Sequence, residues 1–76
     1  MDSTLPGGIY EHYKGRRYLV LGVARHSETA EDVVVYVPLY EHTGPALWVR
    51  PLEMFTEEVE VAAGVVRPRF RFTSET

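Results

Sequence analysis

Two runs of β-branched and aromatic residues constrain the fold of this chain more than any other feature. They are RYLVLGVAR at 17–25 and VVVYVPLY at 33–40. Such residues favour extended backbone, where branched side chains pack well on a pleated surface. Within the first run, which is nearly continuous in apolar character, Gly22 predicts a bend or bulge. Pro38 has no N–H to donate, so we expect it at an edge, at a bulge or where strand pairing ends.

Shorter segments around these runs predict further strands. Residues 8–14 alternate in character and precede a turn at Gly15, which adopts positive φ at little cost. The segment ALWVR at 46–50 predicts a fourth strand, and residues 59–61 return to an extended form before a turn at Gly64. In RPRFRFT at 67–73, basic and aromatic residues alternate. We therefore expect a last strand with Phe70 and Phe72 pointing inward and the arginines outward.

One short helical segment is predicted at 51–55. Pro51 suits the first position of a helix, and Leu52 and Phe55 would share one face. The sequence thus predicts a mainly β fold, a small SH3-like β-barrel of five or six short strands with one short helical or 3-10 turn. The alternative is an open, strongly bent sheet packed by residues 51–59.

The size of the chain indicates one domain that depends on its aromatic residues. With 76 residues and no cysteine it has no disulfide, and nine aromatic residues must supply most of the core. We expect a flexible segment at 1–7 and a single domain at 8–76. Oligomerisation is another source of stability for so small a domain. The lack of a long apolar run or signal-peptide pattern predicts a soluble, cytoplasmic protein without a membrane partner.

The overall charge disfavours a nucleic-acid partner. Eight Lys and Arg residues against eleven Asp and Glu give a net charge of −3 and a pI near 5.5, whereas phosphate binding requires a basic surface. The cations are nevertheless clustered at 14–17 and 67–71 and the acids at 53–60. Complementary charges on solvated faces are the ordinary explanation. Single-stranded nucleic acid stays an alternative ligand, with charge supplied by Lys14, Arg16, Arg17 and Arg25.

Strand alternation suggests a binding surface. It places Tyr10, His12 and Lys14 on one face of the first strand, and Trp48 and Arg50 together on the fourth. We expect these residues to converge at one mouth of the barrel with residues that follow the first and second strands. Such a surface would bind a peptide, an anionic metabolite or a modified base. The predicted ligand-binding residues are Tyr10, His12, Tyr13, Lys14, His26, Glu28, Trp48 and Arg50.

A purely structural interpretation competes with this one. In it, Trp48 belongs to the core, Arg50 forms an ion pair with Glu28 or Glu53, and the tyrosines close the ends of the barrel.

Catalysis and metal binding have weaker support. A small hydrolase using His26 and Glu28, with His12 also available for acid–base work, is the enzyme alternative. However, neighbouring strand residues point to opposite faces, and no cysteine nucleophile or Gly-x-Ser-x-Gly motif is present. The spacing of His12, His26 and His42 matches no metal-ligand signature. We therefore expect no catalytic residue, metal or cofactor.

Four blocks of the sequence carry a family resemblance. They are GIYEHYKGRRYLVLGVARHSET, VVVYVPLYE, LWVRPLEMFTEEVEV and PRFRF, which occur in this order between Gly8 and Phe72. The chain resembles the bacterial family called domain of unknown function 1653, DUF1653. The resemblance implies a small standalone cytoplasmic protein or module, and it transfers no activity, ligand or site residue.

Overall fold

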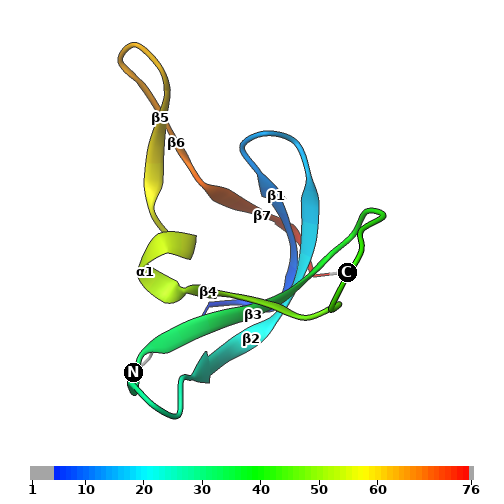
Figure 1. Ribbon diagram of the computed structural model, residues 1–76. Helices are drawn as coiled ribbons and strands as arrows, with labels where there is room; N and C mark the ends of the chain where they lie inside the picture. Colours follow the sequence, from blue (N-terminus) through cyan, green and yellow to red (C-terminus); the bar gives the residue numbers. More distant parts are fainter. Residues whose placement is uncertain (1–4, 76) are drawn as a thin grey trace.

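The protein is mainly β with one short helix, as predicted (Figure 1). The computed structural model describes residues 5–75. Among these residues, no helix has the length and apolar character needed to cross a bilayer. The elements are β1 (Gly8–His12), β2 (Arg17–Arg25), β3 (Asp32–Pro38), β4 (Trp48–Pro51), α1 (Leu52–Phe55), β5 (Glu58–Ala62), β6 (Val65–Pro68) and β7 (Phe70–Ser74).

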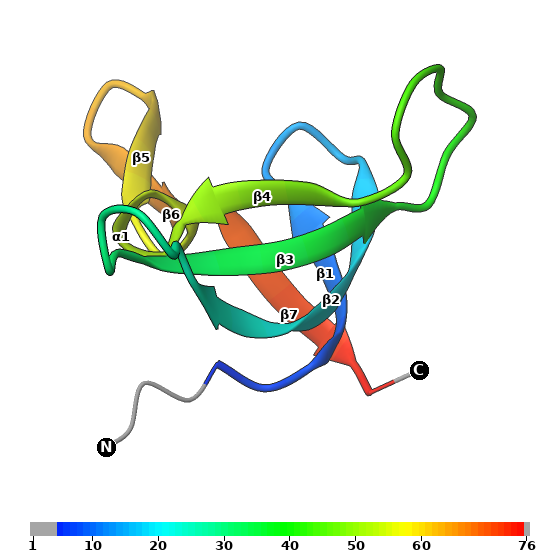
Figure 2. The same ribbon diagram turned by 60° about the horizontal axis from the view of Figure 1, so that its bottom comes forward.

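The main sheet is antiparallel, strongly curved and open. Its five strands follow the order β4-β3-β2-β1-β7, and β5 and β6 form a separate hairpin that projects from the body (Figures 1 and 2). The edge strands β4 and β7 do not pair with each other in the described part of the chain, so a closed barrel is not formed. The reason is that residues 58–68 pair among themselves instead of extending the sheet. The arrangement matches the alternative of an open, bent sheet.

Most strands lie where the sequence predicts them. β2 covers the predicted run, and its register with β3 shifts between Val20 and Gly22. Gly15 has a φ of 102°, and Pro38 ends β3. The last strand differs from the prediction, because a bend at Arg69 divides it into β6 and β7. This division and the β5–β6 hairpin account for seven strands instead of five or six.

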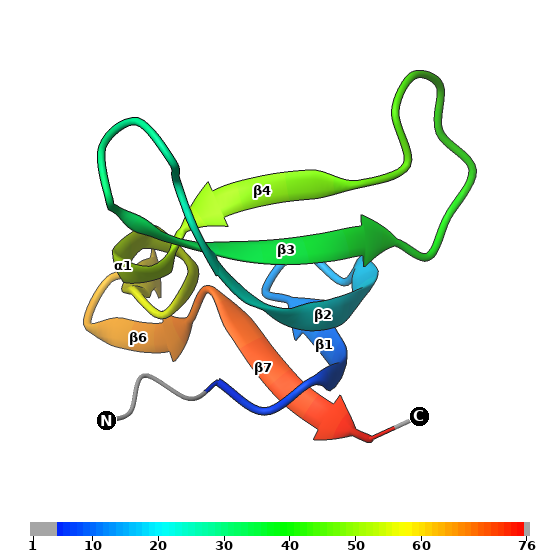
Figure 3. The ribbon, with the colours of Figure 1, turned by 90° about the horizontal axis from the view of Figure 1, so that it is seen from below.

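The strand register defines an inner face of the sheet, whose curvature is seen from below in Figure 3. Residues directly opposite each other in an antiparallel pair lie on the same face. Trp48 and Arg50 therefore share the inner face, and Leu47 and Val49 are largely exposed on the outside. The inner face holds Gly8, Tyr10, His12, Tyr18, Val20, Val34, Tyr36, Trp48, Arg50, Phe70 and Phe72.

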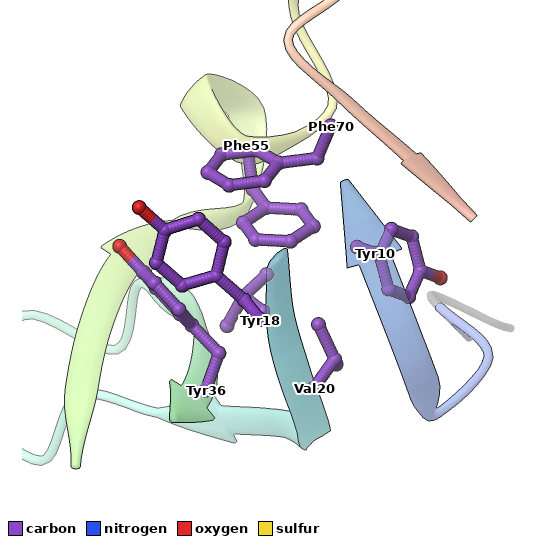
Figure 4. Close-up of a cluster of buried hydrophobic side chains, with 7 residues drawn as sticks. Tyr10, Tyr18, Val20, Tyr36, Phe55 and Phe70 are labelled. Atoms are coloured by element: carbon purple, nitrogen blue, oxygen red, sulfur yellow. The ribbon is translucent and has the colours of Figure 1, made fainter. Parts of the chain in front are cut away.

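The core fills the hollow of this face and is mostly aromatic (Figure 4). Helix α1 places Phe55 parallel to Phe70, with ring centroids 4.0 Å apart. The rings of Tyr18 and Tyr36 pack around Phe70, and their hydroxyls point to the same side. Leu52 is partly buried beside this cluster, so Leu52 and Phe55 share a face as expected.

One expectation about an individual residue needs correction. Phe72 lies on the inner face but is 41% exposed, because β7 is an edge strand and, among residues 5–75, only the Tyr10 ring contacts it. Within the predicted flexible segment 1–7, residues 1–4 lie outside the described part of the chain. Leu5 packs against the core, and the carbonyl of Pro6 accepts a 2.7 Å hydrogen bond from the Tyr10 hydroxyl.

Candidate functional site

A cationic and aromatic site lies where the two edge strands approach each other. Arg50 of β4 donates from Nε to the Tyr36 hydroxyl at 3.4 Å, and its guanidinium carbon is 5.5 Å from the Phe70 ring centroid. His12 of β1 contacts the same ring edge-on, with centroids 4.9 Å apart. Phe70 therefore supports both ionisable side chains. We call His12, Tyr36, Trp48, Arg50 and Phe70 the His12–Arg50 site.

The environment of His12 favours the neutral imidazole. Burial lowers the pKa of His12, and the positive charges of Arg50, Arg69 and Lys14 lower it further. Nδ1 of His12 accepts a 3.1 Å hydrogen bond from the Lys14 backbone N–H. In the neutral ring the proton is consequently on Nε2, which is the nitrogen able to donate.

Trp48 forms an aromatic wall of the site and is only partly buried. Its Nε1 donates to the Pro45 carbonyl at 3.1 Å, and its ring lies 6.0–6.4 Å from four neighbouring rings. Because the N–H already has a partner, the solvent-facing part of the indole is available for stacking. The structural interpretation of Trp48 is therefore correct only for one side of the ring. The four rings belong to Tyr18, Tyr36, Tyr40 and His42.

A tyrosine pair extends the aromatic wall. The hydroxyls of Tyr18 and Tyr40 are 3.1 Å apart, and the Arg16 guanidinium lies 4.3 Å from the Tyr40 ring centroid. Burial and the hydrogen bond to Tyr40 raise the pKa of Tyr18 to about 12. Tyr18 is thus neutral at pH 7, and the Arg16 cation packs on the ring of its partner Tyr40.

A groove adjoins His12 on the other side. It has a volume of about 350 Å³ and separates the end of β1 from the projecting β5–β6 hairpin. Arg71 forms a 2.7 Å ion pair with Glu11 at its wall, whereas Arg67 has no carboxylate partner among residues 5–75. We call this cavity the hairpin groove; it is lined by Glu11, His12, Tyr13, Val61, Arg67, Pro68 and Arg71.

Five of the eight predicted binding residues are near each other, and one more is buried beneath them. His12, Trp48 and Arg50 lie on the inner face, and Tyr13 and Lys14 follow His12 in the turn after β1. Tyr10 shares the face but is 4% exposed, and burial raises its pKa. Tyr10 is therefore a core residue that supports the site from within.

His26 and Glu28 are not part of this arrangement. They follow the far end of β2, and the nine residues of that strand span roughly 26 Å at about 3.3 Å per residue. His26 Nδ1 accepts hydrogen bonds from the backbone N–H groups of Glu28 and Thr29, at 3.1 and 3.4 Å. The expected convergence at one mouth is wrong for these two residues, because the length of β2 separates them from His12.

The predicted ion pair of Arg50 with Glu28 or Glu53 is also not formed. Within the described residues, the side chain of Arg50 contacts Tyr36 and Phe70 instead. Its charge is therefore free of a carboxylate counterion in residues 5–75.

The sequence interpretation missed the contribution of the β6–β7 arginines. Arg69 forms a 3.0 Å ion pair with Glu57, and its Nε is buried without a hydrogen-bond partner in the described structure. The alternation in RPRFRF indicated arginines pointing outward, but the bend at Arg69 turns this side chain toward the site. The other residues missed are Tyr36, Tyr40, Arg67, Phe70 and Arg71.

Several acidic side chains lie together in a different part of the molecule. A second cavity of about 340 Å³ is lined by Glu31, Asp32, Leu52 and Glu53, near the β2–β3 turn and α1. In the described chain, no group of three or more His, Cys, Asp or Glu is arranged to hold a metal ion. The molecule therefore has a basic, aromatic region around His12 and a separate acidic region.

Comparison with known proteins agrees with the fold. A crystal structure of a DUF1653 protein from Bordetella bronchiseptica is similar, with a TM-score of 0.88 and 42% sequence identity. The similarity covers 95% of this chain and 91% of that one. No curated protein matches the sequence. The model of the family described as "Protein of unknown function (DUF1653)" matches residues 8–73, and the chain therefore belongs to the DUF1653 family.

Proposed function

We propose that this protein is a non-enzymatic binding module whose His12–Arg50 site takes an anionic ligand with a planar ring. One observation carries the proposal: His12 and Arg50 both contact the Phe70 ring, and within residues 5–75 neither Arg50 nor Lys14 forms an ion pair with a carboxylate. A site with excess positive charge favours an anion over a cation or a neutral molecule.

The donors of the site suit a carboxylate or phosphate. Arg50 uses one of its five N–H groups on Tyr36, which leaves the four on its terminal nitrogens for a ligand. A guanidinium binds such oxygens in a bidentate manner. His12 adds one donor from Nε2, and the buried Nε of Arg69 has an N–H that no described residue accepts.

The aromatic wall suits a ring on the same ligand. Trp48 presents the exposed part of its indole without an unsatisfied N–H, so a planar group can stack there. Among the predicted ligand classes, an anionic metabolite or a modified base with its phosphate fits better than a neutral peptide.

Trp48 is the only tryptophan, so its fluorescence reports directly on the site. We expect a nucleoside monophosphate to quench it saturably, the matching nucleoside to bind at least tenfold more weakly, and inorganic phosphate to cause little quenching. Arg50→Gln is expected to reduce the affinity about 10- to 100-fold, since an interaction with a charged partner contributes about 1.5–3 kcal/mol.

Arg25→Gln is the matched control, because Arg25 lies at the far end of β2 and pairs with Asp32. This variant is expected to bind like the wild type. If a panel of aromatic nucleotides and carboxylates neither quenches Trp48 nor raises the melting temperature, the proposal is overturned. Equal binding of nucleoside and nucleotide would also overturn it.

Three further predictions from the sequence concern a hydrolase activity, an SH3-like arrangement and the cellular location. A hydrolase using His26 and Glu28 has little support, since the Nδ1 of His26 is engaged by the turn. An SH3-like arrangement is consistent with a strongly curved antiparallel sheet of short strands. A cytoplasmic location stays a prediction from the sequence.

A further inference from the structure

We infer that the natural ligand is a single-stranded nucleic acid that extends from Trp48 past His12 into the hairpin groove. This inference rests on the proposed function and names the ligand class of the same site. It requires two features beyond that site, a series of exposed rings on a common aromatic support and phosphate-binding groups beside them.

A ladder of ring contacts runs from Tyr13, at the hairpin groove, to Trp48. These two residues mark the ends of the proposed ligand path. Tyr13 and His12 have ring centroids 4.5 Å apart, and His12 contacts Phe70 at 4.9 Å. Phe70 is 5.6 Å from Tyr18, which is 6.2 Å from Trp48. Tyr18 and Phe70 are buried and hold the ladder rigid, whereas the other three rings reach solvent. Exposed rings on a rigid support are the surface on which successive bases stack.

Cations follow the same path. Lys14 lies 5.8 Å from the Tyr13 ring, and Arg16 lies 4.3 Å from the ring of Tyr40, which contacts Trp48. Neither has an ion pair with a described residue, and the same holds for Arg50 and Arg67. Interleaved rings and free cations are typical of proteins that bind single strands with little sequence preference.

The hairpin groove gives this path its second half. Arg67 of β6 faces the cavity without a counterion, and Tyr13 and Val61 supply apolar surface there. Its volume of about 350 Å³ is within the range of small-molecule sites, roughly 300–1,000 Å³, and suits one nucleotide. A ligand that fills both the inner face and the groove must therefore be longer than one nucleotide.

The net charge of −3 is not an obstacle to this ligand. Part of the acidic surface lies around Glu31, Asp32 and Glu53, lining a cavity that shares no residue with the hairpin groove. Around the path, the recorded ion-paired carboxylates are those of Glu11 and Glu57, which neutralise Arg71 and Arg69. Within residues 5–75, the cations Lys14, Arg16, Arg50 and Arg67 thus stay without an ion pair despite the negative total charge.

The test measures the affinity for oligothymidylates of one, two, four and twelve nucleotides. Quenching of Trp48 fluorescence monitors binding of each length, and fluorescence anisotropy monitors a labelled twelve-mer. We expect affinity to increase at least tenfold from one to four nucleotides. The logarithm of the affinity should fall with the logarithm of salt concentration with a slope of about −2 to −3, as three or four phosphate contacts on a single strand require.

Arg67→Gln separates this inference from the proposed function. It should weaken binding of the twelve-mer about fivefold and leave the mononucleotide unchanged. Arg25→Gln is the control, because Arg25, which the sequence suggested as a phosphate-binding residue, ends β2 far from His12 and pairs with Asp32. Mononucleotide binding without any gain with length would overturn the inference and leave the proposed function standing. Equal affinity for a duplex, or tighter binding of a poly-glutamate peptide than of the twelve-mer, would also overturn the inference. Failure of every nucleotide to bind would contradict both.

Discussion

Arg50 and Phe70 lie on the two edge strands of the sheet, and the guanidinium carbon of Arg50 is 5.5 Å from the Phe70 ring centroid. Because β4 and β7 share no backbone hydrogen bonds in the described structure, side chains close the gap that strand pairing leaves open. The same contact holds a cation over the core next to His12. The core and the site that we propose for ligand binding therefore share these residues.

The charge of Arg50 should control the protonation of His12. Arg50 is one of the cations that lower the pKa of His12, so Arg50→Gln is expected to raise this pKa toward 6.5. NMR titration of the His12 ring measures the change. Arg25→Gln removes a positive charge at the far end of β2, and it should leave the pKa of His12 unchanged. An unchanged His12 in Arg50→Gln would show that the two groups do not interact.

Acid should destabilise the protein partly through His12. The pKa of His12 is lower in the folded than in the unfolded chain, so below about pH 6.5 the unfolded state binds more protons. Stability from this residue is complete above the unfolded pKa and decreases as the pH falls toward the folded pKa. Urea unfolding at pH 7.5 and pH 5 should show a smaller loss for His12→Gln than for the wild type. The same loss in both proteins would contradict the prediction.

High pH should destabilise the protein partly through Tyr18. Its pKa is raised to about 12, so between about pH 10 and 12 the folded state retains a proton that the unfolded state loses. The free energy of unfolding should therefore decrease with rising pH in this window, and less steeply in Tyr18→Phe. Tyr40→Phe is the companion variant, because it removes the hydrogen bond that helps to raise the pKa. Identical slopes in the wild type and Tyr18→Phe would disprove the assignment.

Phe55 should be the most costly single truncation among the residues of α1. It is 1% exposed and stacks on Phe70, so Phe55→Ala is expected to destabilise the protein by about 3–5 kcal/mol. Phe55→Leu should lower the free energy of unfolding less, so the effect can still be measured if the alanine variant does not fold. Met54→Ala is the matched control, because Met54 is 44% exposed. Chemical denaturation measures all three, and equal effects at 54 and 55 would contradict the core assignment.

His26 should matter for stability and not for binding. Removing its Nδ1 leaves two turn N–H groups without their acceptor, so His26→Ala is expected to cost about 0.5–1.5 kcal/mol. Nucleotide affinity should be unchanged, since the residue lies at the far end of β2. A variant that loses binding at full stability would restore His26 to the site.

The sequence by itself determined the local structure well. β-Branched runs, glycines and prolines act on neighbouring backbone, so β2, the turn at Gly15, the end of β3 and helix α1 could all be predicted. Alternation also placed Trp48 and Arg50 on one strand face. The physical reason is that φ/ψ preference and side-chain direction in a strand are set within a few residues.

Only the tertiary structure decided which of these faces meet. The length of β2 separates His26 from His12, and the bend at Arg69 diverts the chain into a hairpin and leaves the sheet open. Contacts such as Arg50 with Phe70 join strands that are not neighbours in the sheet, so no local pattern contains them. They depend on curvature and on packing across the core, which the whole chain sets together.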